Sequence, residues 1–210
     1  MVRRWDQWRD PWDREYAMRG RLWRPGSQPS PLAGALPDGT LVLDLGCGDG
    51  KHAAALAAAS YGAVGLDRSR HALDLALKHV AAAWLQGDVR RLPIRDAAFA
   101  AVAARYVWGA LDEGDRAIAC KEAWRVLGPG GTLHVEEFAS TDFRADQGPL
   151  VAPGTRQRNQ GIRTHYFERH EMAALAPVEP VTLDAIEWTQ RTHTGPRGRA
   201  AWRASWRKQA

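Results

Sequence analysis

Residues 41–51 read Leu-Val-Leu-Asp-Leu-Gly-Cys-Gly-Asp-Gly-Lys, a short apolar run followed by a loop with a glycine at every second position. The apolar run is typical of a buried strand, and the Ala-rich segment that follows predicts a helix over 51–60. Glycine has no Cβ, so Gly46, Gly48 and Gly50 allow a sharp turn and a close approach of the backbone to a bound molecule. The amide groups at the start of the helix are expected to point towards that molecule. The segment therefore predicts a ligand-binding loop between a strand and a helix.

Strand and helix patterns keep alternating after this loop. Ser69 is expected to cap a helix that runs to about residue 80, and 115–127 predicts an amphipathic helix that ends at the Gly-Pro-Gly-Gly turn 128–131. Such alternation implies parallel strands joined by right-handed crossovers. The further expected strands are 63–67, 82–86, 98–106 and 132–136.

The last third of the chain has a different pattern. Residues 139–163 are polar and predict a long irregular loop, and 168–175 predicts a short helix. Two extended runs, 181–192 and 200–208, flank Gly-Pro-Arg-Gly at 195–198, which predicts a hairpin turn. The sheet is therefore expected to end in an antiparallel hairpin.

The start of the chain carries an aromatic stripe. Trp5, Trp8, Trp12 and Tyr16 are spaced by three, four and four residues, which places them on one face of a helix that must bury that face. A helix docked on the core and a lid over a ligand site both fit this pattern. Residues 25–31 are rich in proline, glycine and serine and read as a linker. We therefore expect a helix and linker over 1–30 and the main domain over 31–210.

Composition narrows the class of protein. The 210 residues are 45% hydrophobic and 25% charged, with a net charge of +5, as in ordinary globular proteins. No run of 18 apolar residues and no secretory leader are seen, so no membrane partner is expected. Cys47 and Cys120 lie in unrelated contexts, which favours a reducing, cytoplasmic location. The arginine surplus near both ends fits either a solvated surface or attraction to RNA or an anionic substrate.

The segment 41–51 resembles the first motif of the class I S-adenosylmethionine-dependent methyltransferases. Asp44 precedes the first glycine by two residues, and the third glycine follows the second at +2, whereas dinucleotide-binding enzymes place it at +3. Residues 92–99 resemble the family's L-P-F…F-D stretch, although Ala100 replaces the usual aspartate, and 122–133 resembles its E-x-x-R-V-L-x-P-G-G-x-L segment. The resemblance runs from about residue 41 to 138. It implies a Rossmann-like, mostly parallel seven-stranded α/β sheet with helices on both faces and an antiparallel C-terminal hairpin.

The resemblance also implies a cofactor, S-adenosylmethionine, and the residues that hold it. Asp44 is expected near its methionine end, Asp67 on the ribose hydroxyls, Asp88 on the adenine amino group, and the Val89 amide on the ring. The full set of expected cofactor-binding residues is Asp44, Gly46, Cys47, Gly48, Asp67, Arg68, Asp88, Val89 and Arg105.

Methyl transfer from a sulfonium needs neither a metal nor a catalytic triad, and the seven histidines form no metal-binding motif, so no metal is expected. Residues 164–167, Thr-His-Tyr-Phe, resemble the H-Y-F stretch of small tellurite-resistance-type enzymes in the methyltransferase type 11 group. The candidate catalytic residues are Tyr106, Glu137, His165 and Tyr166. A general base is needed only for a weakly acidic acceptor.

Three functions remain open at this point. The first is methyl transfer to a small molecule. The second is an RNA or tRNA methyltransferase, because 44–51 resembles the D-x-G-C-G-x-G-K of tRNA wobble-uridine enzymes. The third is a non-catalytic cofactor-binding scaffold or a partner-dependent subunit. Arg105-Tyr106-Val107-Trp108 is not the D/N-P-P-Y motif of enzymes that methylate exocyclic nitrogens, and no Pro-Cys motif for cytosine C5 chemistry occurs.

Overall fold

The computed structural model describes residues 10–22, 30–158 and 161–209, and the chain divides into two compact units after Val89. Trp5, Trp8 and most of the expected linker therefore lie outside the described residues. Among the helices that are described, none has the length and apolar character needed to cross a bilayer.

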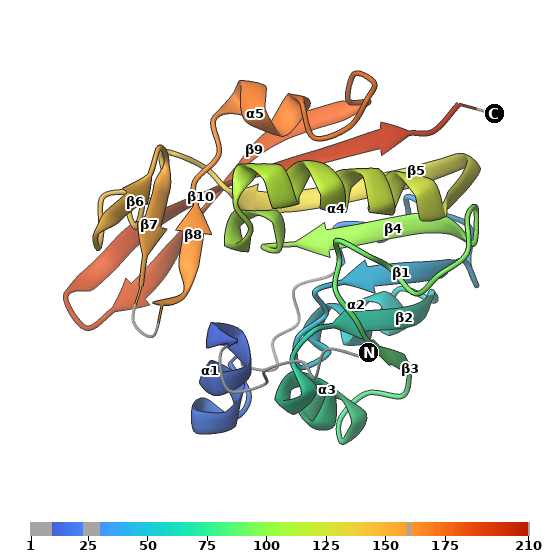
Figure 1. Cartoon of the computed structure of the whole chain (residues 1–210), viewed down its shortest axis with the longest axis horizontal. Coiled ribbons are helices and arrows are strands. Elements are labelled where there is room, and N and C mark those ends of the chain that lie inside the picture. Colours follow the sequence, from blue (N-terminus) through green and yellow to red (C-terminus); the bar gives the residue numbers. More distant parts are fainter. Residues whose placement is uncertain (1–9, 23–29, 159–160, 210) are drawn as a thin grey trace, which may run out of the picture. The chain divides into compact units, whose positions relative to one another are not determined.

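The first unit is built on three parallel strands. Leu43 of β1 (Leu41–Leu45) lies opposite Val64 of β2 (Gly62–Asp67), which lies opposite Ala83 of β3 (Ala83–Gln86). Ser69 caps the third helix of this unit as predicted, because its side chain accepts a hydrogen bond from the Ala72 amide. The elements are α1 (Pro11–Arg19), β1 (Leu41–Leu45), α2 (Lys51–Ala58), β2 (Gly62–Asp67), α3 (Arg70–Leu77) and β3 (Ala83–Gln86), coloured blue to green in Figure 1.

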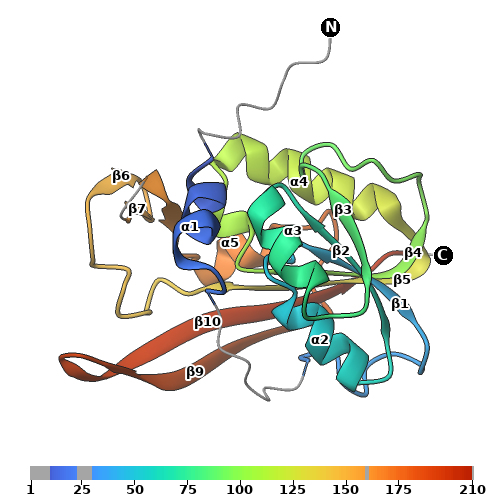
Figure 2. The ribbon, with the colours of Figure 1, turned by 90° about the horizontal axis from the view of Figure 1, so that it is seen from below.

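The second unit pairs two parallel strands with a long antiparallel hairpin, which Figure 2 shows as an extended ribbon. Val102 lies opposite Leu133, and Val135 lies opposite Ala204. The elements are β4 (Phe99–Arg105), η2 (Trp108–Ala110), α4 (Glu113–Val126), β5 (Leu127–Phe138), α5 (Arg169–Ala173), β9 (Thr182–Thr192) and β10 (Gly195–Arg207).

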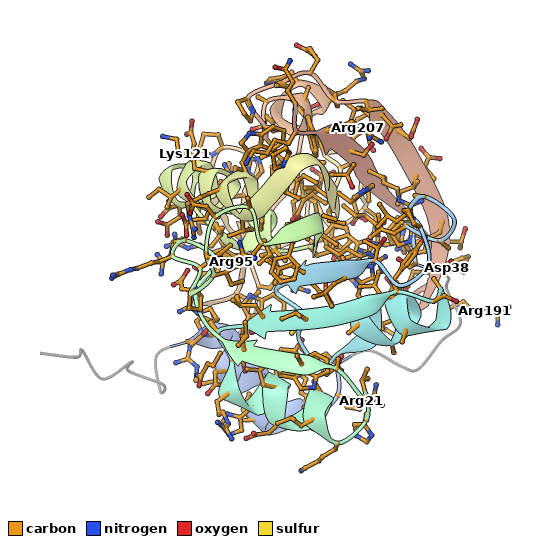
Figure 3. All side chains as sticks on the ribbon, turned by 90° about the vertical axis from the view of Figure 1, so that its right-hand side faces the viewer. Arg21, Asp38, Arg95, Lys121, Arg191 and Arg207 are labelled. Atoms are coloured by element: carbon orange, nitrogen blue, oxygen red, sulfur yellow. The ribbon has the colours of Figure 1, made fainter. Side chains whose placement is uncertain are left out.

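The strand order is β3-β2-β1-β4-β5-β10-β9, which confirms the predicted seven-stranded, mostly parallel α/β sheet ending in an antiparallel hairpin. Each unit has an apolar interior: the inner residues of β1 are buried, and in the second unit Trp108 and Trp206 are fully buried. Figure 3 shows the side chains filling the space on the faces of the strands.

The prediction of an irregular loop over 139–163 is wrong. Three short antiparallel strands, β6 (Leu150–Ala152), β7 (Thr155–Gln157) and β8 (Arg163–His165), form a second small sheet there. Each strand has only three residues, too few to show an alternating pattern in a polar segment.

Two predicted turns are also wrong. β5 begins at Leu127 and runs through residues 128–131, which bulge out because Phe99 lies opposite Leu127 and Ala101 opposite Thr132. In the hairpin, Thr192 pairs with Gly195, so the turn comes before the predicted 195–198 segment, which belongs to β10. In both places the glycines mark an irregular or terminal part of a strand and do not end it.

Candidate functional site

The glycine loop follows β1 and is held in backbone conformations that favour glycine. The φ angles are +62° at Gly46, +54° at Gly48 and +83° at Gly50. A Cβ on Gly50 would lie 2.9 Å from the indole of Trp84, so this glycine allows β3 and the start of α2 to pack closely. Gly50 also occupies the N-cap position of α2. The predicted strand–loop–helix arrangement is confirmed.

Three amides of the loop are used within the protein, whereas the expectation that amides at the start of α2 point at a ligand stays a prediction. The Cys47 amide donates to the carbonyl of Leu66, and the Gly50 amide donates to the carbonyl of Cys47. The Gly48 amide donates to Oδ2 of Asp67 at 2.9 Å. The amides of Cys47 and Gly48 are therefore already bonded within the protein, and the predicted cofactor contacts at Gly46, Cys47 and Gly48 stay predictions.

Asp44 has one carboxylate oxygen in use and one without a partner. It is 1% exposed, and Oδ1 lies 2.9 Å from Nδ1 of His52, whereas Oδ2 has no hydrogen-bond partner among the described residues. A buried acceptor left unsatisfied costs about 1–3 kcal/mol. This oxygen is therefore suited to accept a hydrogen bond from a polar ligand.

His52 is a site residue that the sequence did not suggest. Its Nε2 lies 3.3 Å from Oγ of Ser30, so the ring is held from both sides and orients Asp44. The only available signal was its place early in α2, directly after the glycine loop, where a polar residue on the inner side of an Ala-rich helix needs a partner.

Asp67, at the end of β2, is a second acceptor. Its carboxylate accepts hydrogen bonds from the amides of Gly48 and Ser69, at 2.9 and 2.8 Å. Burial raises the pKa of Asp67 to about 6, although these two hydrogen bonds act in the opposite direction. A carboxylate has about four acceptor positions, so two remain for ligand hydroxyls.

The other predicted cofactor residues of this unit lie nearby in the fold. Asp88 and Val89 come one residue after the end of β3 and are buried. Because parallel strands place their carboxyl ends at one edge, Asp67 and Asp88 follow neighbouring strand ends. The exposed Arg68 forms an ion pair with Asp10, the N-cap residue of α1.

The helix α1 is attached to α3 and reaches the glycine loop. Asp13 accepts hydrogen bonds from Oγ of Ser69 at 2.7 Å and from the amide of His71 at 3.1 Å. Burial acts to raise the pKa of Asp13, but these bonds outweigh it and the pKa is lowered. Tyr16 is 6% exposed, and its hydroxyl occupies the space that a Cβ on Gly48 would need. Tyr16 of the aromatic stripe therefore contacts the loop.

In the second unit, a buried carboxylate organises the ends of β4 and β5. Glu136 Oε1 accepts hydrogen bonds from Arg105 Nη2 at 2.8 Å and Tyr106 Oη at 2.6 Å, and Oε2 accepts from Arg203. Burial opposes ionisation, but the Arg105 charge and these bonds lower the pKa of Glu136. Burial and the Glu136 charge raise the pKa of Tyr106, so its phenol stays protonated. The predicted residues Arg105 and Tyr106 are thus joined by Glu136.

Glu137 faces a different set of partners. It is 1% exposed, and its carboxylate accepts hydrogen bonds from the amides of Val107, Trp108 and Gly109, at 2.7, 2.6 and 3.3 Å. Burial raises its pKa to about 8 despite these donors. The geometry gives this candidate catalytic residue a role in shaping the turn after β4.

His165 and Tyr166 follow different patterns. Both ring nitrogens of His165 have partners, Thr155 Oγ1 at 2.9 Å and Glu171 Oε1 at 3.1 Å, and burial lowers its pKa. Tyr166 is 2% exposed, and its ring lies 6.2 Å from that of Phe138. Since Phe138 also stacks on Tyr106 at 4.2 Å, the two candidate tyrosines flank one ring at the end of β5.

Comparison with known proteins shows that both the sequence and the fold are similar to those of methyltransferases. A family model described as "Methyltransferase domain" matches residues 42–131, a span that includes the glycine loop, Asp67 and Asp88. The solved structure of a SAM-dependent methyltransferase from Methanosarcina mazei matches with a TM-score of 0.71 and 22% identity, covering 85% of this chain and 97% of that one. Residues 42–131 are a class I methyltransferase domain.

Two further similar proteins show how far the comparison extends along the chain and which other activity occurs on this fold. Methyltransferase GfsG of Streptomyces halstedii is 30% identical over 170 residues, and the match covers 75% of this chain and 59% of GfsG. This chain therefore spans about three fifths of the length of that relative. The [4+2]-cyclase SpnF shares the fold, with a TM-score of 0.64, 21% identity, and coverage of 84% of this chain and 78% of that one. The narrower grouping with tellurite-resistance-type enzymes stays a prediction.

S-adenosylmethionine is the cofactor of this methyltransferase class, and the first unit fits it. The cofactor has an amino group and ribose hydroxyls that donate hydrogen bonds, and Asp44 and Asp67 offer acceptor positions. Gly48 has a left-handed backbone conformation and no side chain, and the Tyr16 hydroxyl lies where its Cβ would be. In the described ranges, no three His, Cys, Asp or Glu side chains are grouped as metal ligands would be.

Proposed function

We propose that the chain is an enzyme that transfers the methyl group of S-adenosylmethionine to a small-molecule acceptor by direct displacement. The observation that carries the proposal is Asp44, a buried carboxylate that His52 holds on one oxygen while the other has no partner among the described residues. Asp67, with acceptor positions left at the end of β2, adds the second anchor.

When bound, the cofactor supplies a methyl group on a sulfonium, which is so good a leaving group that the protein mainly aligns the reactants and excludes water. Asp44 would accept a hydrogen bond from the amino group of the cofactor, and Asp67 would accept from its ribose. Asp88 and Val89 would hold the adenine. Tyr16 covers the glycine loop, which keeps water from that part of the site.

The acceptor side supports a small molecule. Glu136 lies near the end of β5 and Tyr166 directly follows β8, and each is 2% exposed. Polymer backbones are bound by exposed basic side chains, whereas these groups suit a compact acceptor. Tyr106 stays protonated and His165 has both nitrogens engaged, so we assign these two residues to positioning. The acceptor atom then attacks in a form that already has a free electron pair.

A transfer assay tests the proposal, and it is needed because the cyclase SpnF shares the fold. The protein is incubated with methyl-labelled cofactor and cell extract separated into small molecules, RNA and protein. We expect label in the small-molecule fraction. Label confined to RNA or protein would contradict the acceptor class, and binding without any transfer would favour a scaffold.

A pair of matched variants tests whether transfer depends on the proposed cofactor site. Asp67→Ala should abolish transfer and weaken cofactor binding by at least about 30-fold, because a charge-assisted anchor is lost. Asp74→Ala, which removes an exposed carboxylate paired with Arg70 on α3, should leave both unchanged. Equal effects of the two variants would remove Asp67 from the site.

A further inference from the structure

Three arginines gather near the end of β5, in a group of residues that the cofactor site does not use. Arg199 of β10 is the central one: its side chain is 5% exposed, and its guanidinium lies 4.5 Å from the ring of Phe138 and 5.1 Å from that of Trp188. We call the arginine cluster the group Arg144, Arg158, Arg199, Asp142, Gln190 and Tyr166.

The guanidinium of Arg199 is fixed on most sides but not fully bonded. Nε donates to Asp142 at 2.6 Å and Nη1 donates to Oε1 of Gln190. Nη2 is buried and has no hydrogen-bond partner among the described residues. A rigid cation with an unused donor is prepared to bind an acceptor group.

Asp142 cannot neutralise the cluster. Its Oδ2 accepts from Arg199 and from the amide of Ala200 at 3.0 Å, and its Oδ1 accepts from the amide of Arg144. Within the arginine cluster, one carboxylate therefore acts on the guanidinium groups of both Arg199 and Arg144. Its oxygens are already engaged in fixing the backbone on either side.

Arg144 and Arg199 are held together by a neutral group. Oε1 of Gln190 accepts from Nη2 of Arg144 at 3.2 Å and also from Arg199. Burial lowers the pKa of Arg144, and the charges of Arg199 and Arg158 lower it further. The repulsion between these cations is a free-energy cost that a bound anion would relieve.

Tyr166 places the arginine cluster beside the proposed acceptor site. Burial raises the pKa of its phenol and Asp142 adds to this effect, while the charges of Arg158, Arg144 and Arg199 act to lower it. The ring of Phe138 has Tyr106 stacked on it and Arg199 over it. The cluster and the candidate tyrosines thus share the end of β5, the edge at which α/β sheets bind ligands.

We propose that the arginine cluster binds an oxyanion, a carboxylate or a phosphate, of the small-molecule acceptor, so that the methyl acceptor is an anionic compound. The inference rests on the proposed function and names its substrate class. Planar guanidinium groups bind both oxyanions through paired hydrogen bonds. Arg144 is less buried than Arg199 and bonds to a neutral amide through one of its nitrogens, so it has further donors for the same anion.

A binding experiment tests the site without relying on catalysis. Protein with nitrogen-labelled arginine is titrated with inorganic phosphate and, separately, with benzoate, at constant ionic strength. We expect at least one of the two anions to cause saturable shifts in the Nε signals of Arg199 and Arg144. Arg144→Gln should weaken that binding about 10-fold or more, and Arg191→Gln, an exposed arginine of β9 seen in Figure 3, should not. No saturable shift with either anion would overturn the proposal.

The transfer assay supplies the second test. The small-molecule extract is separated by anion exchange, and label is expected in the retained, anionic fraction. Arg144→Gln should raise the KM for that acceptor by about 10-fold or more and leave the cofactor Kd unchanged, and Arg199→Lys, which keeps the charge but loses the planar fork, should also raise it. Label in neutral compounds at a rate unaffected by Arg144→Gln would overturn the anionic acceptor while the methyltransferase function stands. Saturable anion binding without transfer to any small molecule would support the anion site and contradict the proposed function.

Discussion

At the scale of single residues, the site depends on carboxylates whose partners differ. Asp44 has a histidine on one oxygen, Asp67 has two backbone amides, and Glu137 has three. The same functional group thus serves as a ligand anchor in one place and as a support for a backbone turn in another. The partners of each carboxylate indicate which role it has.

Asp67 should make cofactor binding depend on pH. Its pKa is about 6, above its ordinary value of 3.8, and only the ionised form accepts from both ribose hydroxyls. Affinity should therefore rise with pH up to about 7 and fall about 10-fold at pH 5, where about a tenth of the groups are ionised. Calorimetry between pH 5 and 8 measures this. Asp67→Asn should flatten the profile, and an equally steep profile in that variant would assign the titration to another group.

Gly48 and Tyr16 should be coupled. Gly48→Ala places a Cβ where the Tyr16 hydroxyl lies and also forces a left-handed alanine, which costs about 1–2 kcal/mol by itself. Tyr16→Phe removes the overlapping oxygen, so the double variant should recover part of the loss of stability. Urea unfolding measures both. Gly39→Ala, at φ +78° in open space, is the control for backbone strain alone, and a Gly48→Ala variant no worse than this control would contradict the contact.

At the scale of elements, regular segments could be predicted and irregular ones could not. β1, β2 and α3 could be predicted because apolar runs and a serine cap, which are local in the sequence, contribute most to the stability of these elements. β6 to β8 lie in a polar stretch, where pairing between short strands leaves no periodic pattern. The bulge at 128–131 and the hairpin turn depend on which residues stand opposite on β4 and β9, and that pairing is non-local.

The turn after β4 should respond to the protonation of Glu137. Its pKa is about 8 in the folded protein and 4.5 ordinarily, so the folded state holds the proton more tightly and loses stability as the pH rises from about 4.5 to 8. Glu137→Gln keeps an acceptor oxygen without this titration. The variant should therefore lose less unfolding free energy than the unmodified protein between pH 5.5 and 8.5, by urea unfolding. Glu187→Gln, an exposed site on β9, should not change the slope, and a Glu137→Gln slope equal to that of the unmodified protein would contradict the assignment.

At the scale of the whole molecule, the chain combines a recognisable cofactor half with an acceptor half that its sequence hardly defines. The predicted cofactor residues of the first unit are brought to a common edge because parallel strands end together. Arg144, Arg158 and Arg199 come from three separate segments, and nothing in their spacing indicates that they meet. His52 was missed for a similar reason, since its partner Ser30 is 22 residues away.

The net charge of +5 should not produce strong salt dependence. Contacts to 6–10 polymer phosphates would weaken binding by about 10³–10⁵-fold between 50 and 200 mM salt. One anionic group on a small acceptor should raise KM by only about 2- to 5-fold over that range. Steady-state kinetics at several salt concentrations distinguish the two, and a steep slope would favour an RNA acceptor over a small molecule.

The amide of Gln190 has a consequence for how this enzyme could change its preference. Exchanging its nitrogen for an oxygen, as in Gln190→Glu, would supply from within the protein the negative charge that Arg144 and Arg199 otherwise take from outside. A negative charge on the substrate would then no longer be needed. In a competition assay, the rate of methylation of uncharged acceptors should rise relative to that of anionic ones. A single substitution at position 190, reachable by one nucleotide change, would therefore alter which acceptors are preferred.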